Sequence, residues 1–119
     1  MIKHNFGDNV ETSTILKNMH RRIIKNFLDV LILTELRKRP LSGYDIIAFI
    51  NNKFRILVSS GTVYSFLYSL EREGLVAGVW NRRKRVYKLT EKGEETIKAI
   101  KSANNEIQYL VSSLLNVSK

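Results

Sequence analysis

Residues 75–90 restrict the fold of this chain more than any other segment, because they carry a β-type pattern between segments that are otherwise helical. Leu75–Trp80 and Arg85–Thr90 are two short runs rich in Val, Leu and aromatic residues. The polar residues Asn81-Arg82-Arg83-Lys84 separate them. Two such runs joined by a short polar connection predict a β-hairpin, so the chain must pack one hairpin against helices.

Alternation along the second run predicts which side chains of the hairpin face the core. Tyr87 and Leu89 share one face of that strand, while Val86 and Lys88 point the other way. At the end of the first run we expect Trp80 to pack at the edge of the core. The hairpin should therefore contribute one face to a core that it shares with the helices.

Three helices are predicted before the hairpin, and the first two have clear boundaries in the sequence. The first opens at Asn26 and Asp29, a pair with the spacing of an N-cap and its partner, and it stops before Pro40. The second opens at Ser42-Gly43-Tyr44-Asp45, another capping signature, and continues to about Asn52. A third helix follows at Ser60–Glu73, so three helices lead into the hairpin.

Helical patterns also occur at both ends of the chain. Residues 1–12 are polar and are expected to be poorly ordered. In Thr14–Ile24 the apolar residues recur at helical spacing with basic residues between them, which predicts a short amphipathic helix. This helix is too short, and too poor in aromatic residues, to favour binding to a membrane. After the hairpin, Thr90 caps a long final helix whose first turns hold three glutamates.

Three helices followed by a β-hairpin form the winged variant of the helix-turn-helix. We therefore expect an α+β fold that is mostly α. It comprises a winged helix-turn-helix (three helices plus a β-hairpin wing), an N-terminal helical extension and a long C-terminal dimerisation helix. The expected divisions are residues 1–25 for the extension with its short amphipathic helix, 26–90 for the winged-helix DNA-binding domain, and 91–119 for the C-terminal helix.

Composition limits the possible function classes. The 119 residues suit one domain, and the absence of cysteine excludes disulfides, thiolate zinc sites and cysteine nucleophiles. The chain has two histidines and no Gly-rich phosphate loop, so we expect no enzyme, no catalytic residues, no metal site and no cofactor. We expect a cytoplasmic protein, because no apolar run suggests a membrane span or signal peptide.

The positive charge of the chain is clustered. Lys and Arg number 20 against 11 Asp and Glu, for a net charge of +9. No acidic residue lies between Gly74 and Thr90, where the cations are Arg82, Arg83, Lys84, Arg85 and Lys88. Segregated charge favours a binding face for a polyanion, although basic residues in a solvated loop are the alternative. For a winged helix the polyanion is double-stranded DNA.

The helix at Ser60–Glu73 is the one expected to enter the major groove. Its outward face carries mostly hydroxyl groups, which lack the bidentate geometry that Arg or Asn offers to a base. Sequence preference should therefore be modest or supported by DNA shape. For Tyr64 and Tyr68, packing against the hairpin is an equal alternative. The candidate DNA-binding residues here are Ser59, Ser60, Gly61, Thr62, Tyr64, Ser65, Tyr68 and Arg72.

The hairpin connection is the second candidate contact with DNA. Arg82, Arg83, Lys84 and Arg85 form a basic hook that suits the phosphates along a minor groove. Trp80 stands beside them, and stacking on a base or sugar is the alternative to its packing at the core edge.

A heptad pattern in the final helix predicts a homodimer. The repeat positions are Ile97, Ile100, Asn104, Ile107, Val111 and Leu114. A single Asn in an aliphatic line can fix the register of two helices. A helix of about 25 residues would be ~37 Å long, which is too long for so small a body to cover. Packing on another helix of the same chain, such as the N-terminal one, is expected in addition, and purely intramolecular packing is the alternative.

Three ordered motifs carry a resemblance to a known family. They are Leu41-Ser42-Gly43-Tyr44-Asp45-Ile46-Ile47, Ser59-x-Gly61-Thr62-Val63-Tyr64-x-x-Leu67-x-x-Leu70-Glu71-x-x-Gly74-Leu75-Val76, and Arg85-Val86-Tyr87-x-Leu89-Thr90-x-x-Gly93. Over about residues 25–100 the chain resembles the PadR family of transcriptional regulators. The chain departs from the family at Ser60 and Ser65, where members commonly have Pro.

The resemblance implies a winged helix that binds a palindromic operator as a homodimer, usually as a repressor, with the C-terminal helix forming the dimer. It also implies that a small-molecule effector can exist, but the sequence identifies none. The alternative function is a winged helix for protein–protein interaction, or a subunit of a transcription complex, without its own sequence-specific operator. The hydroxyl-rich face at Ser60–Glu73 favours this alternative, whereas the cationic hairpin favours DNA.

Overall fold

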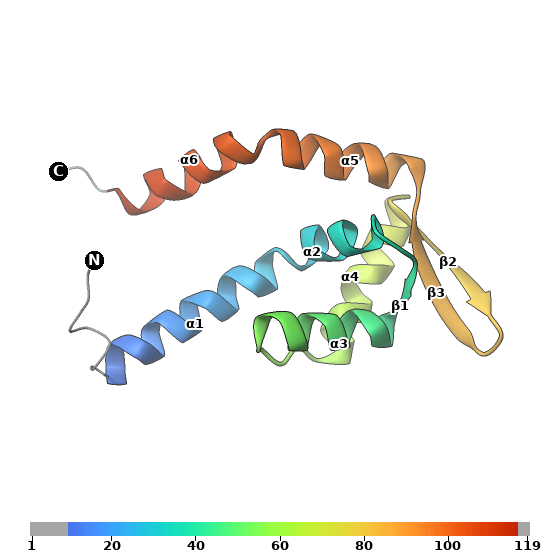
Figure 1. Cartoon of the computed structure of the whole chain (residues 1–119), viewed down its shortest axis with the longest axis horizontal. Helices are drawn as coiled ribbons and strands as arrows, with labels where there is room; N and C mark the ends of the chain where they lie inside the picture. Colours follow the sequence, from blue (N-terminus) through green and yellow to red (C-terminus); the bar gives the residue numbers. More distant parts are fainter. Residues whose placement is uncertain (1–9, 117–119) are drawn as a thin grey trace.

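In the computed structural model, which describes residues 10–116, helices and a small sheet surround one core (Figure 1). The helices are α1 (Val10–Asn26), α2 (Leu28–Leu36), α3 (Gly43–Phe54), α4 (Ser60–Arg72), α5 (Glu91–Ser102) and α6 (Asn104–Leu115). The strands are β1 (Leu41–Ser42), β2 (Val76–Asn81) and β3 (Lys84–Leu89). The predicted order of three helices, a hairpin and a C-terminal helix is confirmed. The expected poor order of residues 1–12 is wrong for residues 10–12, which belong to α1, and for residues 1–9 it lies outside the described part.

The sheet is antiparallel, with the strand order β1-β3-β2. Strand β1 was not predicted, because a two-residue strand has no periodicity of its own. It forms when Leu41 pairs with Tyr87 and Ser42 pairs with Val86. Through this pairing β3 becomes the central strand, and the hairpin is fixed to the start of α3.

The hairpin turn is shorter than the predicted four-residue connection. Asn81 and Lys84 are paired as the last residues of β2 and β3, so only Arg82 and Arg83 lie between the strands. Arg82 has φ of 64°, in the left-handed region that two-residue hairpin turns commonly require. As a result the two arginines stand at the tip of the hairpin.

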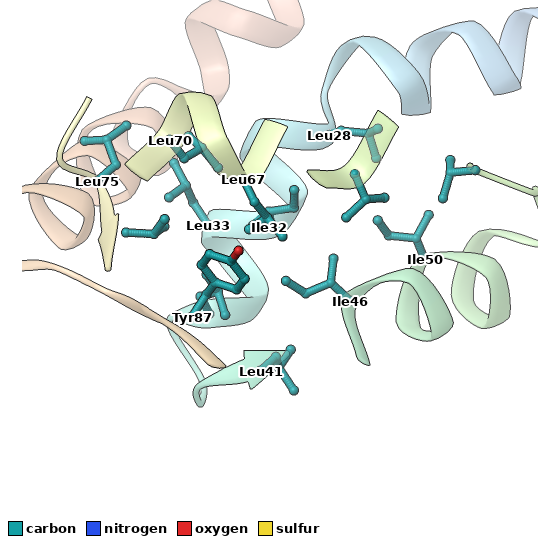
Figure 2. Packing of buried hydrophobic residues seen from close by; sticks show 14 of the residues in the cluster. Leu28, Ile32, Leu33, Leu41, Ile46, Ile50, Leu67, Leu70, Leu75 and Tyr87 are labelled. Carbon is teal, nitrogen blue, oxygen red and sulfur yellow. The ribbon is translucent and has the colours of Figure 1, made fainter. Parts of the chain in front are cut away.

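The core lies between α2, α3, α4 and the sheet (Figure 2). Tyr87 is 1% exposed and packs there, as the alternation predicted. Leu89 is partly buried against the same cluster, and Lys88 is exposed. The prediction for Trp80 is wrong: its side chain is 68% exposed, because the end of the hairpin extends past the helices (Figure 1).

Side-chain caps fix the starts of α3 and α5 as predicted. The Ser42 hydroxyl accepts from the Asp45 N–H at 3.1 Å, and the Asp45 carboxylate accepts from the Ser42 N–H at 3.3 Å. The hydrogen bond with the Ser42 side chain is the main reason that the pKa of Asp45 is lowered. At α5, the Thr90 hydroxyl accepts from the Gly93 N–H at 3.0 Å. Both caps thereby satisfy N–H groups that the first helical turns leave unpaired.

The predicted N-cap at Asn26 is wrong. Asn26 is the last residue of α1, and α2 starts after Phe27 without any side-chain cap. The Phe27 N–H still bonds to the Ile23 carbonyl at 3.1 Å, and its own carbonyl accepts from Leu31 at 2.9 Å. The Val30 N–H bonds to the Asp29 carboxylate at 2.8 Å, so Asp29 and not Asn26 satisfies an N–H group in the first turn of α2.

The predicted long C-terminal helix is interrupted. Ala103, with φ of −89° and ψ of 16°, separates α5 from α6. Its N–H bonds to the carbonyls of Ala99 and Ile100, and its carbonyl accepts from Ile107 at 2.9 Å. The two asparagines that follow Ala103 are weak helix formers, which is consistent with a break at this point.

The molecule is elongated, because α1 and α6 extend away from the core on the side opposite the hairpin (Figure 1). Its radius of gyration is 17.1 Å, whereas a compact chain of this length has about 13–14 Å. Many apolar side chains of the two helices are uncovered. Those exposed on α1 are Ile15, Leu16, Met19 and Ile23, and those on α6 are Tyr109, Leu110, Val111, Leu114 and Leu115.

A glycine at the start of α5 gives a test of the packing. Gly93 is buried against the Leu75 carbonyl, where a Cβ would overlap the backbone oxygen. We expect Gly93→Ala to lower the free energy of unfolding by about 1–3 kcal/mol. The control is Gly61→Ala in α4, where a Cβ would meet only the Ser59 Oγ at 4.0 Å. This substitution should raise the free energy of unfolding by about 0.5–1 kcal/mol. Urea unfolding followed by circular dichroism measures both, and equal effects of the two substitutions would contradict this packing.

Candidate nucleic-acid interface

Helix α4 is held with one face in the core and the other in solvent. The Ser59 Oγ accepts from the Thr62 N–H at 3.1 Å and lies 2.8 Å from the Thr62 hydroxyl. Val63 and Leu67 are fully buried on the inner face. The helix and its N-cap agree with the sequence prediction, and the opposite face is turned outward.

The outer face of α4 is rich in hydroxyl groups. Thr62 is half-buried because its hydroxyl lies against Ser59. Arg72 stands at the C-terminal end and donates to the Ser69 hydroxyl at 3.3 Å. The candidate residues that are exposed are Ser59, Ser60, Gly61, Ser65, Tyr68 and Arg72.

The two tyrosines of α4 differ in their surroundings. Tyr64 is half-buried, and its ring lies so close to Gly43 of α3 that a Cβ there would collide with it. Tyr68 is 57% exposed, and its ring centroid is 6.3 Å from that of Tyr64. Tyr64 therefore packs within the protein, on α3 as well as near the hairpin, whereas Tyr68 is open to a partner.

The turn of the hairpin presents three exposed cations, Arg82, Arg83 and Lys84. They follow one another along the chain, so their charges repel unless an anion lies between them. A cationic turn next to an outward-facing helix has the arrangement that a winged helix needs to contact two neighbouring grooves of a duplex.

Arg85 does not belong to this exposed group. Its guanidinium Nη2 donates to the Glu71 carboxylate at 2.7 Å, and the same carboxylate oxygen accepts from the Gly78 N–H at 3.2 Å. The absence of a side chain at Gly78 leaves room for the guanidinium. Arg85 shares the inward face of β3 with Tyr87, so alternation could have predicted its contact with α4. Its charge is compensated by Glu71, and it fixes the hairpin to the helix.

A pocket of about 450 Å³ lies between α4, the start of α3 and the hairpin. Sequence reasoning did not find it, because its residues come from elements far apart along the chain. We call it the aromatic pocket, since four of the five tyrosines and the single tryptophan line it. Its residues are Ser42, Tyr44, Tyr64, Tyr68, Trp80, Arg83, Lys84, Arg85 and Tyr87.

Two buried polar atoms bordering the aromatic pocket, the Tyr87 hydroxyl and the Arg85 Nε, have no hydrogen-bond partner within residues 10–116. Burial raises the pKa of Tyr87, so its phenol is neutral at physiological pH. The Arg85 guanidinium lies 5.6 Å from the centre of the Tyr87 ring. Both atoms are enclosed by the protein itself, and unpaired buried polar groups of this kind are costly in a folded protein.

The structure divides the predicted heptad seam into two parts. Ile97 is fully buried and Ile100 is partly buried against the core of the same chain. Asn104 is exposed and accepts from the Gln108 amide at 3.1 Å. Val111 and Leu114 are 45% and 73% exposed. Only the second half of the seam is therefore free to meet a second chain.

An apolar groove of about 500 Å³ runs along the first four positions of this seam, Ile97, Ile100, Asn104 and Ile107. It joins residues of the α1–α2 junction to residues of α5 and α6. We call it the helix groove, and its residues are Phe27, Val30, Thr34, Ile97, Ile100, Lys101, Asn104 and Ile107.

No group of three or more His, Asp or Glu side chains in the described part of the chain could hold a metal ion. No helix within residues 10–116 is both long enough and apolar enough to cross a bilayer.

The helices α2, α3 and α4, the antiparallel sheet and the cationic turn define the chain as a winged helix-turn-helix protein. A sequence model of the transcriptional regulator PadR-like family matches residues 32–99. The chain belongs to the PadR-like family of transcriptional regulators. No curated protein sequence matches it significantly.

Solved structures of similar fold include several members of this family. A PadR family transcriptional regulator from Eggerthella lenta has a TM-score of 0.73 at 23% identity, covering 89% of this chain and 96% of that one. A PadR-like regulator from Bacillus cereus has a TM-score of 0.68 at 24% identity, covering 82% and 99%. PadR of Bacillus subtilis, solved in complex with operator DNA, has a TM-score of 0.53 at 28% identity, covering 60% and 44%.

Proposed function

We propose that this protein is a sequence-specific, homodimeric DNA-binding repressor that occupies a palindromic operator. The observation that carries the proposal is the outward, hydroxyl-rich face of α4 beside the exposed cations of the hairpin turn. The operator complex of the Bacillus subtilis relative supports it. Regulation of transcription also requires that the protein be located with the DNA, which for a bacterial or archaeal cell is the cytoplasm.

Each part of the interface has its own task in this proposal. The N-terminal turn of α4 enters the major groove, where Ser60, Gly61 and Ser65 approach phosphates and base edges. The hairpin turn lies over the neighbouring minor groove, where Arg82 and Arg83 neutralise phosphates. Affinity therefore comes mainly from the hairpin, and sequence preference comes from α4 and DNA shape.

The exposed apolar faces of α1 and α6 support a homodimer. Soluble monomers rarely expose large contiguous apolar patches, and here the patch adjoins the helix groove. A second copy of α6, with Leu110 and Leu114 facing inward, supplies the same apolar chemistry and completes a two-fold interface. In the dimer the two α4 helices would lie about 34–36 Å apart, one helical turn of DNA.

A regulator that occupies an operator can repress by excluding the transcription machinery from the promoter. An effector, if the protein has one, must bind the DNA-competent and incompetent dimers with different affinities. Selection of bound duplexes from a random DNA pool tests the proposal. We expect an enriched inverted repeat with half-sites about 10 base pairs apart. Recovery of random sequences only would instead support a protein–protein interaction module.

A substitution on α4 tests its role in reading DNA. Ser65→Asn places an amide that can bond to adenine in a bidentate manner, so preference for adenine at one position of each half-site should increase by about 1–3 kcal/mol. Competition binding with operators that differ at single positions measures this change. Ser102→Asn, on the exposed surface of α5, is the matched control and should leave the preference unchanged. The same response from both variants would remove α4 from the interface.

A further inference from the structure

We propose that the aromatic pocket binds an unstacked base of single-stranded DNA. This inference rests on the proposed function and deepens it, because it assigns a second form of the same polyanion to a part of the interface that shares Arg83 and Lys84 with the hairpin. The pocket lies beside the cationic turn but apart from the N-terminal turn of α4, which the duplex proposal uses.

The first argument is the exposure of flat side chains at one place. Tyr44, Tyr68 and Trp80 are 73%, 57% and 68% exposed, and they come from α3, α4 and β2. An isolated exposed aromatic residue needs no explanation. Three of them that converge from separate elements on one pocket form a surface to which another flat group can stack.

The second argument is charge. Arg83 and Lys84 line the mouth of the aromatic pocket, and no acidic side chain lines it. The nearby Glu71 carboxylate is already engaged by Arg85 and by the Gly78 N–H. The complementary ligand is therefore both flat and anionic. Sites for single-stranded nucleic acid combine these two features, a cationic groove for the backbone and aromatic rings for the bases.

The third argument distinguishes a base from a sugar or phosphate alone. Tyr87 and Arg85 line the pocket, while the Tyr87 hydroxyl and the Arg85 Nε are buried and have no partner within the described residues. A nucleobase carries hydrogen-bonding groups along its edge and two open faces when it is unstacked. Inside a duplex, its pairing edge is occupied and both faces are covered. An unstacked base therefore offers the exposed rings of Tyr44, Tyr68 and Trp80 an open face that a paired base in a duplex does not.

Trp80 makes the proposal directly measurable, because it is the only tryptophan in the chain. The full chain is titrated with an oligothymidine strand, with an abasic strand of equal length, and with a duplex. We expect the oligothymidine to quench the Trp80 emission to saturation, and the abasic strand to bind at least about tenfold more weakly with little quenching. The duplex, followed by the anisotropy of a label on the DNA, should bind while leaving the emission nearly constant.

Single substitutions test which side chains bind the oligothymidine. Tyr68→Ala should weaken binding of the oligothymidine by about 5- to 150-fold, the range for loss of one stacked base. Tyr44→Ala should act in the same direction, and because that side chain is 73% exposed its removal should not disturb folding. The matched control is Leu57→Ala, where the side chain is 82% exposed and outside the pocket, and no change is expected.

The outcomes separate this inference from the proposed function. Equal binding of oligothymidine and abasic strand, or an unchanged Trp80 emission, overturns the base site even if the duplex binds. Quenching by the single strand without any binding of duplex supports the base site and contradicts the duplex function. Failure of all three ligands to bind contradicts both.

Discussion

Replacement of Leu110 and Leu114 by aspartate is expected to convert the protein into monomers whose winged helix remains folded. Both leucines are exposed in the single chain, at 59% and 73%, so the substitutions remove nothing from its core. In the proposed dimer they are buried, and an unpaired buried charge costs about 3–5 kcal/mol. The dimer dissociation constant should therefore increase by at least about 10²-fold for each aspartate.

Sedimentation equilibrium measures the change in association, and circular dichroism verifies the fold. Ser112→Asp is the matched control, because it adds the same charge to α6 at an exposed polar position and should leave the dimer intact. The double variant should also lose affinity for a complete palindrome while retaining weak binding to a half-site. A dimer that persists in the double variant would place the interface elsewhere.

The second large effect is expected at the hairpin turn. Substitution of Arg82, Arg83 and Lys84 by alanine removes three exposed cations from each protomer. Binding to every duplex, random or selected, should weaken by about 10²–10³-fold at ~0.1 M salt, because each lost phosphate contact removes about 0.9 from the slope of log affinity against log salt. The ratio of specific to random binding should stay nearly the same.

Electrophoretic mobility shift or fluorescence anisotropy over several salt concentrations measures the affinity for each duplex and the ratio of specific to random binding. The control is a triple alanine variant of Lys25, Lys53 and Lys98, which removes the same net charge at exposed positions outside the hairpin. If the two triple variants lose the same affinity, net charge alone accounts for binding and the hairpin has no special role.

The sequence predicted those elements whose determinants are local. Three helices begin at predicted caps, in which a side chain accepts from the backbone N–H three residues further on. The caps are Ser42, Ser59 and Thr90. The alternation that buries Tyr87 is likewise a property of one strand. Each of these signals depends on the chain immediately around it, so no partner element had to be known.

The missed features depend on contacts between distant segments. Strand β1 exists because Leu41 meets Tyr87. Arg85 was assigned to DNA by its basic neighbours, although Glu71, 14 positions away, holds it. Exposure of Trp80 follows from how far the hairpin extends past the helices, which local patterning does not determine.

The candidate site shows the same division. The cations of the turn and the hydroxyls of α4 could be found from the sequence, because each set is contiguous or lies on one helix. The aromatic pocket could not, since Tyr44, Tyr68 and Trp80 meet only after α3, α4 and the hairpin have packed. Tyr64 also needed the structure, because its position against Gly43 of α3 depends on helix packing.

The affinity for duplex DNA over a salt series is the most direct test that the protein is a DNA-binding regulator. If the hairpin turn and α4 of a dimer make roughly six to ten phosphate contacts, affinity should fall by about 10³–10⁵-fold between ~50 and ~200 mM salt. The selected palindrome should remain preferred over random duplex throughout the series. An affinity that stays flat with salt, or that is equal for both duplexes, would contradict a DNA-binding regulator.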